Sequence, residues 1–186
     1  MYKTVGFLLG FFISILLVSV LMIIMSKKLN TDNAAKTKYD ERQQLVRGNA
    51  YRIAFWSLVV FVIIYAMIDS TNIVLPCVNT VAIFFIIFLA ILIHTIYCIF
   101  NDGYFGINNK PKSYYILFLI IGLLNLAIGV LNTIEGNLYT DGKLDLPVVN
   151  YMAGIVFVIL GIAIVIKALI SKSKAEEDDE DEEDYA

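Results

Sequence analysis

The one histidine of the chain, His94, precedes Tyr97 and Cys98 by three and four residues. At those spacings the three side chains share one face of an α-helix. Imidazole and thiolate both bind metals, but a metal site needs about three or four ligands, and the sequence offers no further partner. We therefore predict no metal site. We interpret His94 as a hydrogen-bonded packing residue and keep it as a candidate pH-sensitive group.

Carboxylates near the ends of apolar stretches are the other groups that could do chemistry. Asp40, Glu41 and Asp102 could join His94 in an acid–base site only if all four lay within a few ångströms of one another. The sequence holds no nucleophile elbow, Walker loop or zinc signature. Ionisable groups deep in apolar stretches, which mark membrane enzymes and ion-coupled transporters, are scarce. We expect no catalytic residue, no cofactor and no enzyme activity.

Long apolar stretches must position these residues. Hydrophobic residues make up 59% of the 186 residues and charged residues 17%, and the mean hydropathy is +0.77. A helix needs about 20 apolar residues to cross about 30 Å of hydrocarbon. The sequence therefore predicts an all-α, multi-pass membrane protein with one transmembrane domain over residues 1–171. Its five predicted spans are 5–25, 53–68, 81–100, 114–134 and 148–170.

The basic residues predict the orientation of the spans. All of the lysines and arginines except Lys3 and Lys143 fall on one side of the predicted topology. Positive charge favours the cytoplasmic side. We expect the N-terminus outside, the C-terminus in the cytoplasm and the protein in the cell membrane. The lipid bilayer is then its first partner, and nothing in the sequence suggests nucleic acid.

Two cytoplasmic segments stand out from the apolar stretches. Loop 26–52 contains the pattern Thr37-Lys38-Tyr39-Asp40, a helix-start signal. We expect a short interfacial helix after it, with an elbow at Gly48 and Asn49 before the second span, because both residues weaken a helix. The tail, 172–186, carries consecutive acidic residues from 176 to 184. Such a run repels itself, so we predict a disordered tail, with docking onto the basic loop as the alternative.

Small and polar residues indicate how the last two spans pack, because close contact and hydrogen bonds decide helix association in lipid. Both spans carry a stripe of glycine and asparagine on one face, and the two stripes are mirror images in spacing. We predict an antiparallel pair in which Asn132 faces Asn150, with Asn125 opposite Phe157. The same register pairs Gly129 with Gly154 and Gly122 with Gly161.

The first span has its own ladder of small residues, Gly6, Gly10 and Ser14. This spacing is typical of close helix packing. Packing against another helix of the same chain is the main interpretation, and a homodimer through the first helix is the alternative.

Two short motifs carry a resemblance over residues 39–130. The first is Asp40-Glu41-Arg42-Gln43 with Arg47-Gly48-x-Ala50-Tyr51 and Ala54-Phe55, and the second is Asp102-x-Tyr104-Phe105-Gly106-Ile107-Asn108. The chain resembles uncharacterised small multi-pass membrane proteins of Gram-positive bacteria. The resemblance implies that the motifs belong together, but it implies no activity. Gly103 stands where the pattern has alanine.

Three functions remain open on this evidence. The first is a non-enzymatic scaffold or regulator of a membrane or cytoplasmic protein. Its candidate contact residues are Asp40, Glu41, Arg42, Arg47, Asp102, Tyr104 and Phe105. The second is a subunit of a small-molecule or lipid transporter, with a cavity bounded by the span asparagines and His94. The third is an interfacial membrane enzyme.

Overall fold

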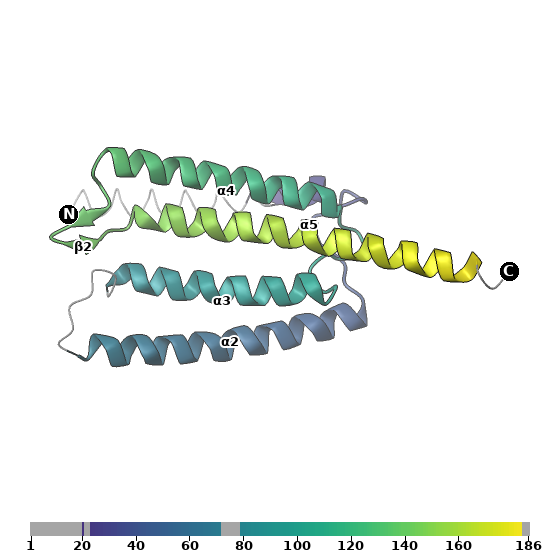
Figure 1. Cartoon of the computed structure of the whole chain (residues 1–186), viewed down its shortest axis with the longest axis horizontal. Helices are drawn as coiled ribbons and strands as arrows, with labels where there is room; N and C mark the ends of the chain where they lie inside the picture. Colours follow the sequence, from purple (N-terminus) through teal and green to yellow (C-terminus); the bar gives the residue numbers. More distant parts are fainter. Residues whose placement is uncertain (1–19, 21–22, 72–78, 184–186) are drawn as a thin grey trace.

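The computed structural model describes residues 20, 23–71 and 79–183, with side chains up to Ser173 (Figure 1). The described part is helical apart from its loops and one short hairpin, and residues 20 and 23–29 are helical. Four helices are long and apolar enough to cross a membrane. They are α2 (Glu41–Asp69), α3 (Thr80–Phe100), α4 (Pro111–Ile134) and α5 (Val148–Glu183).

The predicted first span, 5–25, lies outside the described residues except for residues 20 and 23–25. Gly6, Gly10 and Ser14 therefore lie outside them too. The first span and the homodimer through it stay predictions.

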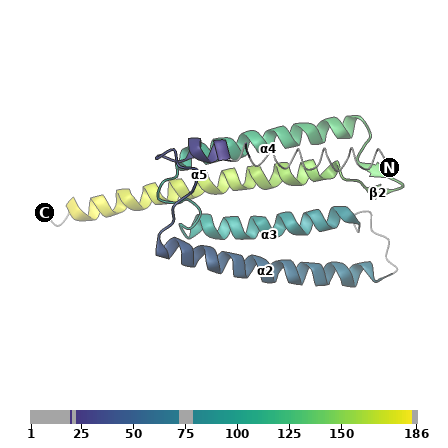
Figure 2. The same cartoon turned by 180° about the vertical axis from the view of Figure 1, so that it is seen from behind.

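The four helices lie in one row in the order α2, α3, α5, α4 (Figures 1 and 2). Neighbours in this row are the helices that pack on one another. The core lies where α3, α4 and α5 meet. It contains Ile99, Phe118, Val156, Leu160, Ala163 and Ile164. By contrast, Ala50 is the one buried residue of α2, which packs on α3 and leaves most of its apolar surface exposed.

α2 begins later than the sequence signal suggested, and it has no elbow. Asp40 is the N-cap: its carboxylate accepts a hydrogen bond from the Gln43 backbone at 2.6 Å. The Gln43 side chain accepts one in return from the Asp40 N–H, which completes a capping box. The helix then continues through Gly48 and Asn49 into its apolar segment. The predicted elbow was wrong, because a glycine costs a helix only about 1 kcal/mol and the flanking turns supply more.

α4 and α5 form an antiparallel pair, but not in the predicted register. A Cβ atom at Gly129 would lie 3.0 Å from the Tyr151 ring, and one at Gly122 would lie 3.1 Å from the Gly154 carbonyl oxygen. The predicted pairs of Gly129 with Gly154 and Gly122 with Gly161 were therefore wrong. Large side chains occupy the space beside most of these glycines, whereas facing glycines would have left a void.

The span asparagines also behave differently from the prediction. Asn125 and Asn132 each donate to a carbonyl four residues earlier, at 2.9 Å. Asn150 donates to the Pro147 carbonyl at 3.2 Å. Each amide thus bonds within its own segment. The hydrogen bond between the two helices joins the hydroxyls of Thr133 and Tyr151, at 2.6 Å.

A small hairpin joins α4 to α5, with β1 (Tyr139–Thr140) paired to β2 (Lys143–Leu144). Asp141 and Gly142 at its turn have φ angles of 51° and 76°. Two positive φ angles at Asp-Gly are the mark of a type I′ hairpin turn. We call this end of the bundle the hairpin end.

The tail also differs from the predicted disorder, since the α5 backbone is helical as far as Glu183. It extends beyond the other helices at the end opposite the hairpin (Figure 1). Extending an existing helix avoids the cost of nucleation, and glutamate is a good helix former, so like-charge repulsion need not break it. Docking of the acidic run onto loop 26–52 stays a prediction, because the side chains of that run lie outside the described residues.

Candidate functional site

Two loops that are far apart in sequence meet at the end opposite the hairpin. Asn30 and Asn109 form an antiparallel bridge, and the Thr31 N–H donates to the Asn108 carbonyl at 2.7 Å. The Ile107 N–H donates to the Lys38 carbonyl at 2.9 Å. We call residues 30–38 together with 102–110 the loop cluster, and this end of the bundle the loop end.

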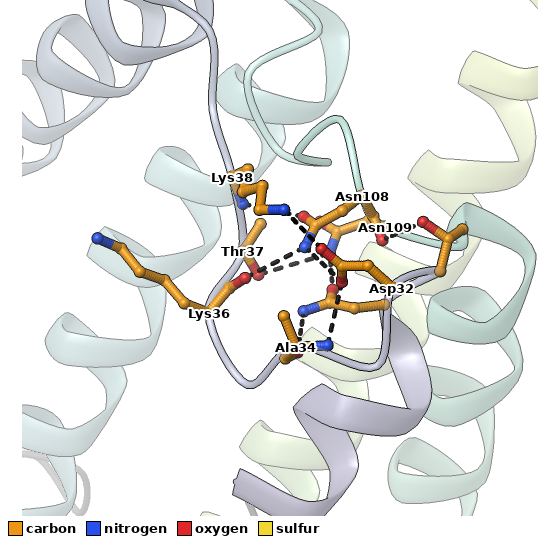
Figure 3. A network of polar contacts seen from close by, with 9 residues as sticks. Asp32, Ala34, Lys36, Thr37, Lys38, Asn108 and Asn109 are labelled. Carbon is orange, nitrogen blue, oxygen red and sulfur yellow. Dashed lines mark hydrogen bonds and ion pairs between the residues drawn. The ribbon is translucent and has the colours of Figure 1, made fainter.

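Asparagine side chains hold the loop cluster together (Figure 3). Asn108 is buried and makes three bonds: it accepts from the Lys38 N–H at 2.9 Å and donates to Asp32 and the Lys36 carbonyl, both at 3.1 Å. Asn109 donates to the side chain of the fully buried Asn30 at 2.5 Å. Buried amides satisfied in this way fix one loop conformation.

Asp32 adds a charged group to the same network. Its carboxylate accepts hydrogen bonds from the Lys38 ammonium at 2.8 Å and the Ala34 N–H at 3.1 Å. The hydrogen bond from Lys38, then those from Ala34 and Asn108, lower the pKa of Asp32 to about 2. The carboxylate is therefore charged near neutral pH and is a weak base.

Two glycines allow the loops to approach this closely. A Cβ atom at Gly103 would lie 2.5 Å from the Val46 side chain on α2, and one at Gly106 would overlap the Lys38 carbonyl oxygen. Gly103 is the position where the resembling pattern has alanine. In this chain the space that an alanine methyl would need is occupied by Val46.

Asp102 connects the loop cluster to two helices. Its carboxylate lies 3.5 Å from the Arg42 guanidinium of α2 and 3.0 Å from the Lys167 ammonium of α5. Lys167 also donates to the carbonyl of Phe100, at 3.2 Å. Asp102 itself has a φ of 60°, in the left-handed region that aspartate tolerates at turns. One carboxylate thus contacts the start of α2 and the end of the spanning part of α5.

Two aromatic candidates point inward. Tyr104 and Phe105 pack edge-on against Tyr114, with ring centroids 6.2 and 5.4 Å away, and Tyr104 also meets Phe118. Burial raises the pKa of the Tyr104 phenol. Both rings pack against the core and are partly buried.

Arg47 is also partly covered. Its guanidinium lies 4.2 Å from the centre of the Tyr39 ring, a cation–π contact. Burial raises the pKa of Tyr39, and the nearby Arg47 charge opposes that rise. Asp40, Glu41 and Arg42 are exposed at the start of α2.

His94 lies on the α2–α3 contact. Its ring stacks on Tyr51 with centroids 4.3 Å apart, and its Nε2 lies 3.8 Å from the Cys98 sulfur. The buried Nδ1 has no well-formed hydrogen bond, although the Ala50 backbone approaches it. Nowhere in the described residues do three or more His, Cys, Asp or Glu side chains form a group that could hold a metal.

The candidate acid–base residues each have a different structural role. Asp40 caps α2, Asp102 pairs with cations on two helices, and His94 stacks on an aromatic ring. None of these contacts joins one candidate to another. The arrangement is that of a structural junction, with no nucleophile–base pair among these residues.

Sequence reasoning did not single out Asn30, Asn109 and Lys167, which help to hold the junction together, and it placed Asn108 only at the end of the second motif. One signal was present: asparagine recurs at 30, 33, 101, 108 and 109, in the two loops that meet. Asparagine favours turns because its side chain bonds nearby backbone. That preference alone does not predict pairing across some 75 residues of chain.

The chain matches no protein-family model, no curated protein and no solved structure.

Proposed function

We propose that this chain is a non-enzymatic integral membrane protein that scaffolds or regulates a partner protein, which it binds through its loop end. The observation that carries the proposal is the loop cluster itself. Two separate loops are fixed by buried asparagines, while charged residues at the start of α2 remain on the surface. A rigid, hydrogen-bonded surface binds a partner at a lower ordering cost than flexible loops would.

Apolar exposure at the loop end supports a protein partner. Ile107 is 69% exposed within the cluster, and Leu45 is 72% exposed in the second turn of α2. Leu45 lies one helical turn after the exposed Arg42 on α2, and Ile107 lies in the loop cluster. Mixed apolar and arginine surface is common in protein interfaces.

We place the loop end in the cytoplasm and the protein in the cell membrane. The structure brings the basic loop 26–52, the 101–110 turn and Lys167 to the same end of the bundle. Lys143 lies at the hairpin end. This distribution follows the rule that positive charge stays inside.

A transporter subunit has less support. Its proposed cavity required the span asparagines to share a polar path, but Asn125, Asn132 and Asn150 each bond within their own segment. The cavity beside His94, about 250 Å³ in volume, is lined mainly by apolar side chains. An interfacial enzyme has less support still, because its candidate groups are engaged separately.

Site-specific photo-crosslinking in intact cells tests the proposal. A benzophenone amino acid replaces Ile107 at the loop end or, as a matched control, Tyr139 at the hairpin end, which is 60% exposed. We expect a discrete protein adduct from position 107 that disappears when Arg42→Glu is added. Equal adducts from both positions, or none from position 107, would contradict a partner at the loop end.

A further inference from the structure

A groove at the loop end runs between the start of α4 and the last spanning turns of α5. Its volume is about 580 Å³, and Ile164, Ala168 and Leu169 of α5 form much of its apolar wall. Tyr115 lines the α4 side. Lys112 and Lys172 lie at its rim, one on each helix, and both are exposed.

The chemistry of this groove defines its occupant. Among the residues whose side chains the structure describes, its lining includes two lysines, one from each helix, and no carboxylate. An apolar trough on a membrane-spanning helix, closed at the headgroup level by two ammonium groups, matches one acyl chain and the phosphate of a phospholipid. We propose that this groove is a binding site for an anionic phospholipid, whose headgroup lies between Lys112 and Lys172 and whose chain lies along α5.

The site differs from other exposed apolar surface of the bundle. The hollow between α3 and α5, about 220 Å³ in volume, is lined by apolar residues such as Phe88 and Met152 and has no cation. Such a surface accepts any lipid chain. The α4–α5 groove adds a charge requirement, and charge is what separates an anionic from a zwitterionic lipid of equal chain length.

Occupancy would also affect the bundle. The groove lies between α4 and α5. α4 begins directly after the loop cluster, and Lys167 of α5 forms an ion pair with Asp102 of that cluster. A lipid held by both helices stabilises their contact by mass action, because it binds the folded pair only.

The test is lipid titration of the purified full-length protein in a non-ionic detergent, followed by native mass spectrometry. The probes are phosphatidylglycerol and phosphatidylcholine with identical chains. We expect tighter binding of phosphatidylglycerol. Each lysine near an anionic group contributes a factor of roughly five, so K112Q/K172Q should weaken that lipid about 30-fold and remove the preference.

Two further variants separate a groove from general charge attraction. A168W keeps both lysines but fills the trough, and it should weaken phosphatidylglycerol at least tenfold. K143Q removes a cation at the hairpin end and should leave binding unchanged. Every variant is checked for wild-type helicity by circular dichroism.

Equal affinity for the two lipids would overturn the proposal. So would wild-type binding by A168W, which would mean that the lysines attract lipid without a groove. Neither result depends on the partner or the membrane orientation proposed above, so the two proposals fail separately.

Discussion

Replacing Asn108 with alanine should open the loop cluster. The substitution removes three hydrogen bonds, those to the Lys38 N–H, the Asp32 carboxylate and the Lys36 carbonyl. A neutral hydrogen bond contributes about 1 kcal/mol net and one to a charged carboxylate somewhat more, so the loss is at least about 3 kcal/mol. The change acts on the closure of the loops, because Asn108 lies outside the core shared by α3, α4 and α5.

Amide hydrogen exchange measures this opening. The informative amides are those of Thr31 and Ile107, because their acceptors are backbone carbonyls that the substitution leaves in place. If the cluster opens as a unit, about 3 kcal/mol accelerates their exchange roughly 100-fold. Faster exchange confined to Lys38, with Thr31 and Ile107 within threefold of wild type, would refute a cooperative cluster.

Asn137 supplies the matched control. It is exposed at the hairpin end, and its amide donates to Glu135 at 2.9 Å. N137A makes the same chemical change far from the loop cluster. Exchange at Thr31 and Ile107 should then stay at the wild-type rate, since distant independent sites do not couple.

Three further predictions concern the loops, the α4–α5 contact and pH. Gly106→Ala should accelerate loop exchange at least tenfold, because the new methyl overlaps the Lys38 carbonyl. Gly129→Ala should destabilise the protein by about 1–3 kcal/mol in thermal unfolding, since the Tyr151 ring lies only 3.0 Å from the new Cβ. Acidification should loosen the loop cluster as Asp32 becomes protonated. The folded protein lowers the pKa of Asp32 from 3.8 to about 2, so the charged carboxylate stabilises the fold fully at pH values above 3.8. That contribution is lost as the pH falls from 3.8 toward 2, and amide exchange in the loops measures the loss.

Gly48 is the control for both glycine substitutions. Nothing lies within 4 Å of a Cβ atom at this position, which is inside α2. Gly48→Ala should therefore raise stability by up to about 1 kcal/mol through helix propensity. If G106A and G129A behave like G48A, the close contacts at those two glycines have no energetic effect. For the pH prediction, exchange unchanged between pH 5 and pH 2, after correction for the intrinsic rate, would be the contradicting result.

The apolar stretches predicted the helices because the signal is physical and redundant. A stretch of some 20 apolar residues can satisfy its backbone hydrogen bonds in lipid only as a helix. Four helices of this length and composition are present in the described residues. Helix ends depend on single hydrogen bonds and were harder to place. Both Thr37 and Asp40 carry capping side chains, and the reciprocal bond with Gln43 decides in favour of Asp40.

The α4–α5 register shows where patterns fail. Equal glycine spacing on two helices is compatible with several offsets, and each offset is decided by how well large side chains fill the space. Tyr151 fits beside Gly129 and also reaches the Thr133 hydroxyl, so packing and a hydrogen bond favour the same offset. The spacing of the glycines alone predicts neither this packing nor this hydrogen bond.

The polar contacts at the loop end add to what holds the row of helices together, each exposed ion pair contributing about 0–1 kcal/mol. In lipid the hydrophobic effect contributes little to helix association, so a helix such as α2, with one buried residue, gains little from its flat contact with α3. Asp102 reaches α2 through Arg42 and α5 through Lys167, and thus joins helices that are not neighbours in the row. These ion pairs lie at the end of the bundle, where water and headgroups lower the cost of desolvation. They therefore avoid the penalty that an ion pair buried inside the bundle would carry. The same location keeps them at the surface that a partner would contact, so structural support and recognition depend on the same few residues.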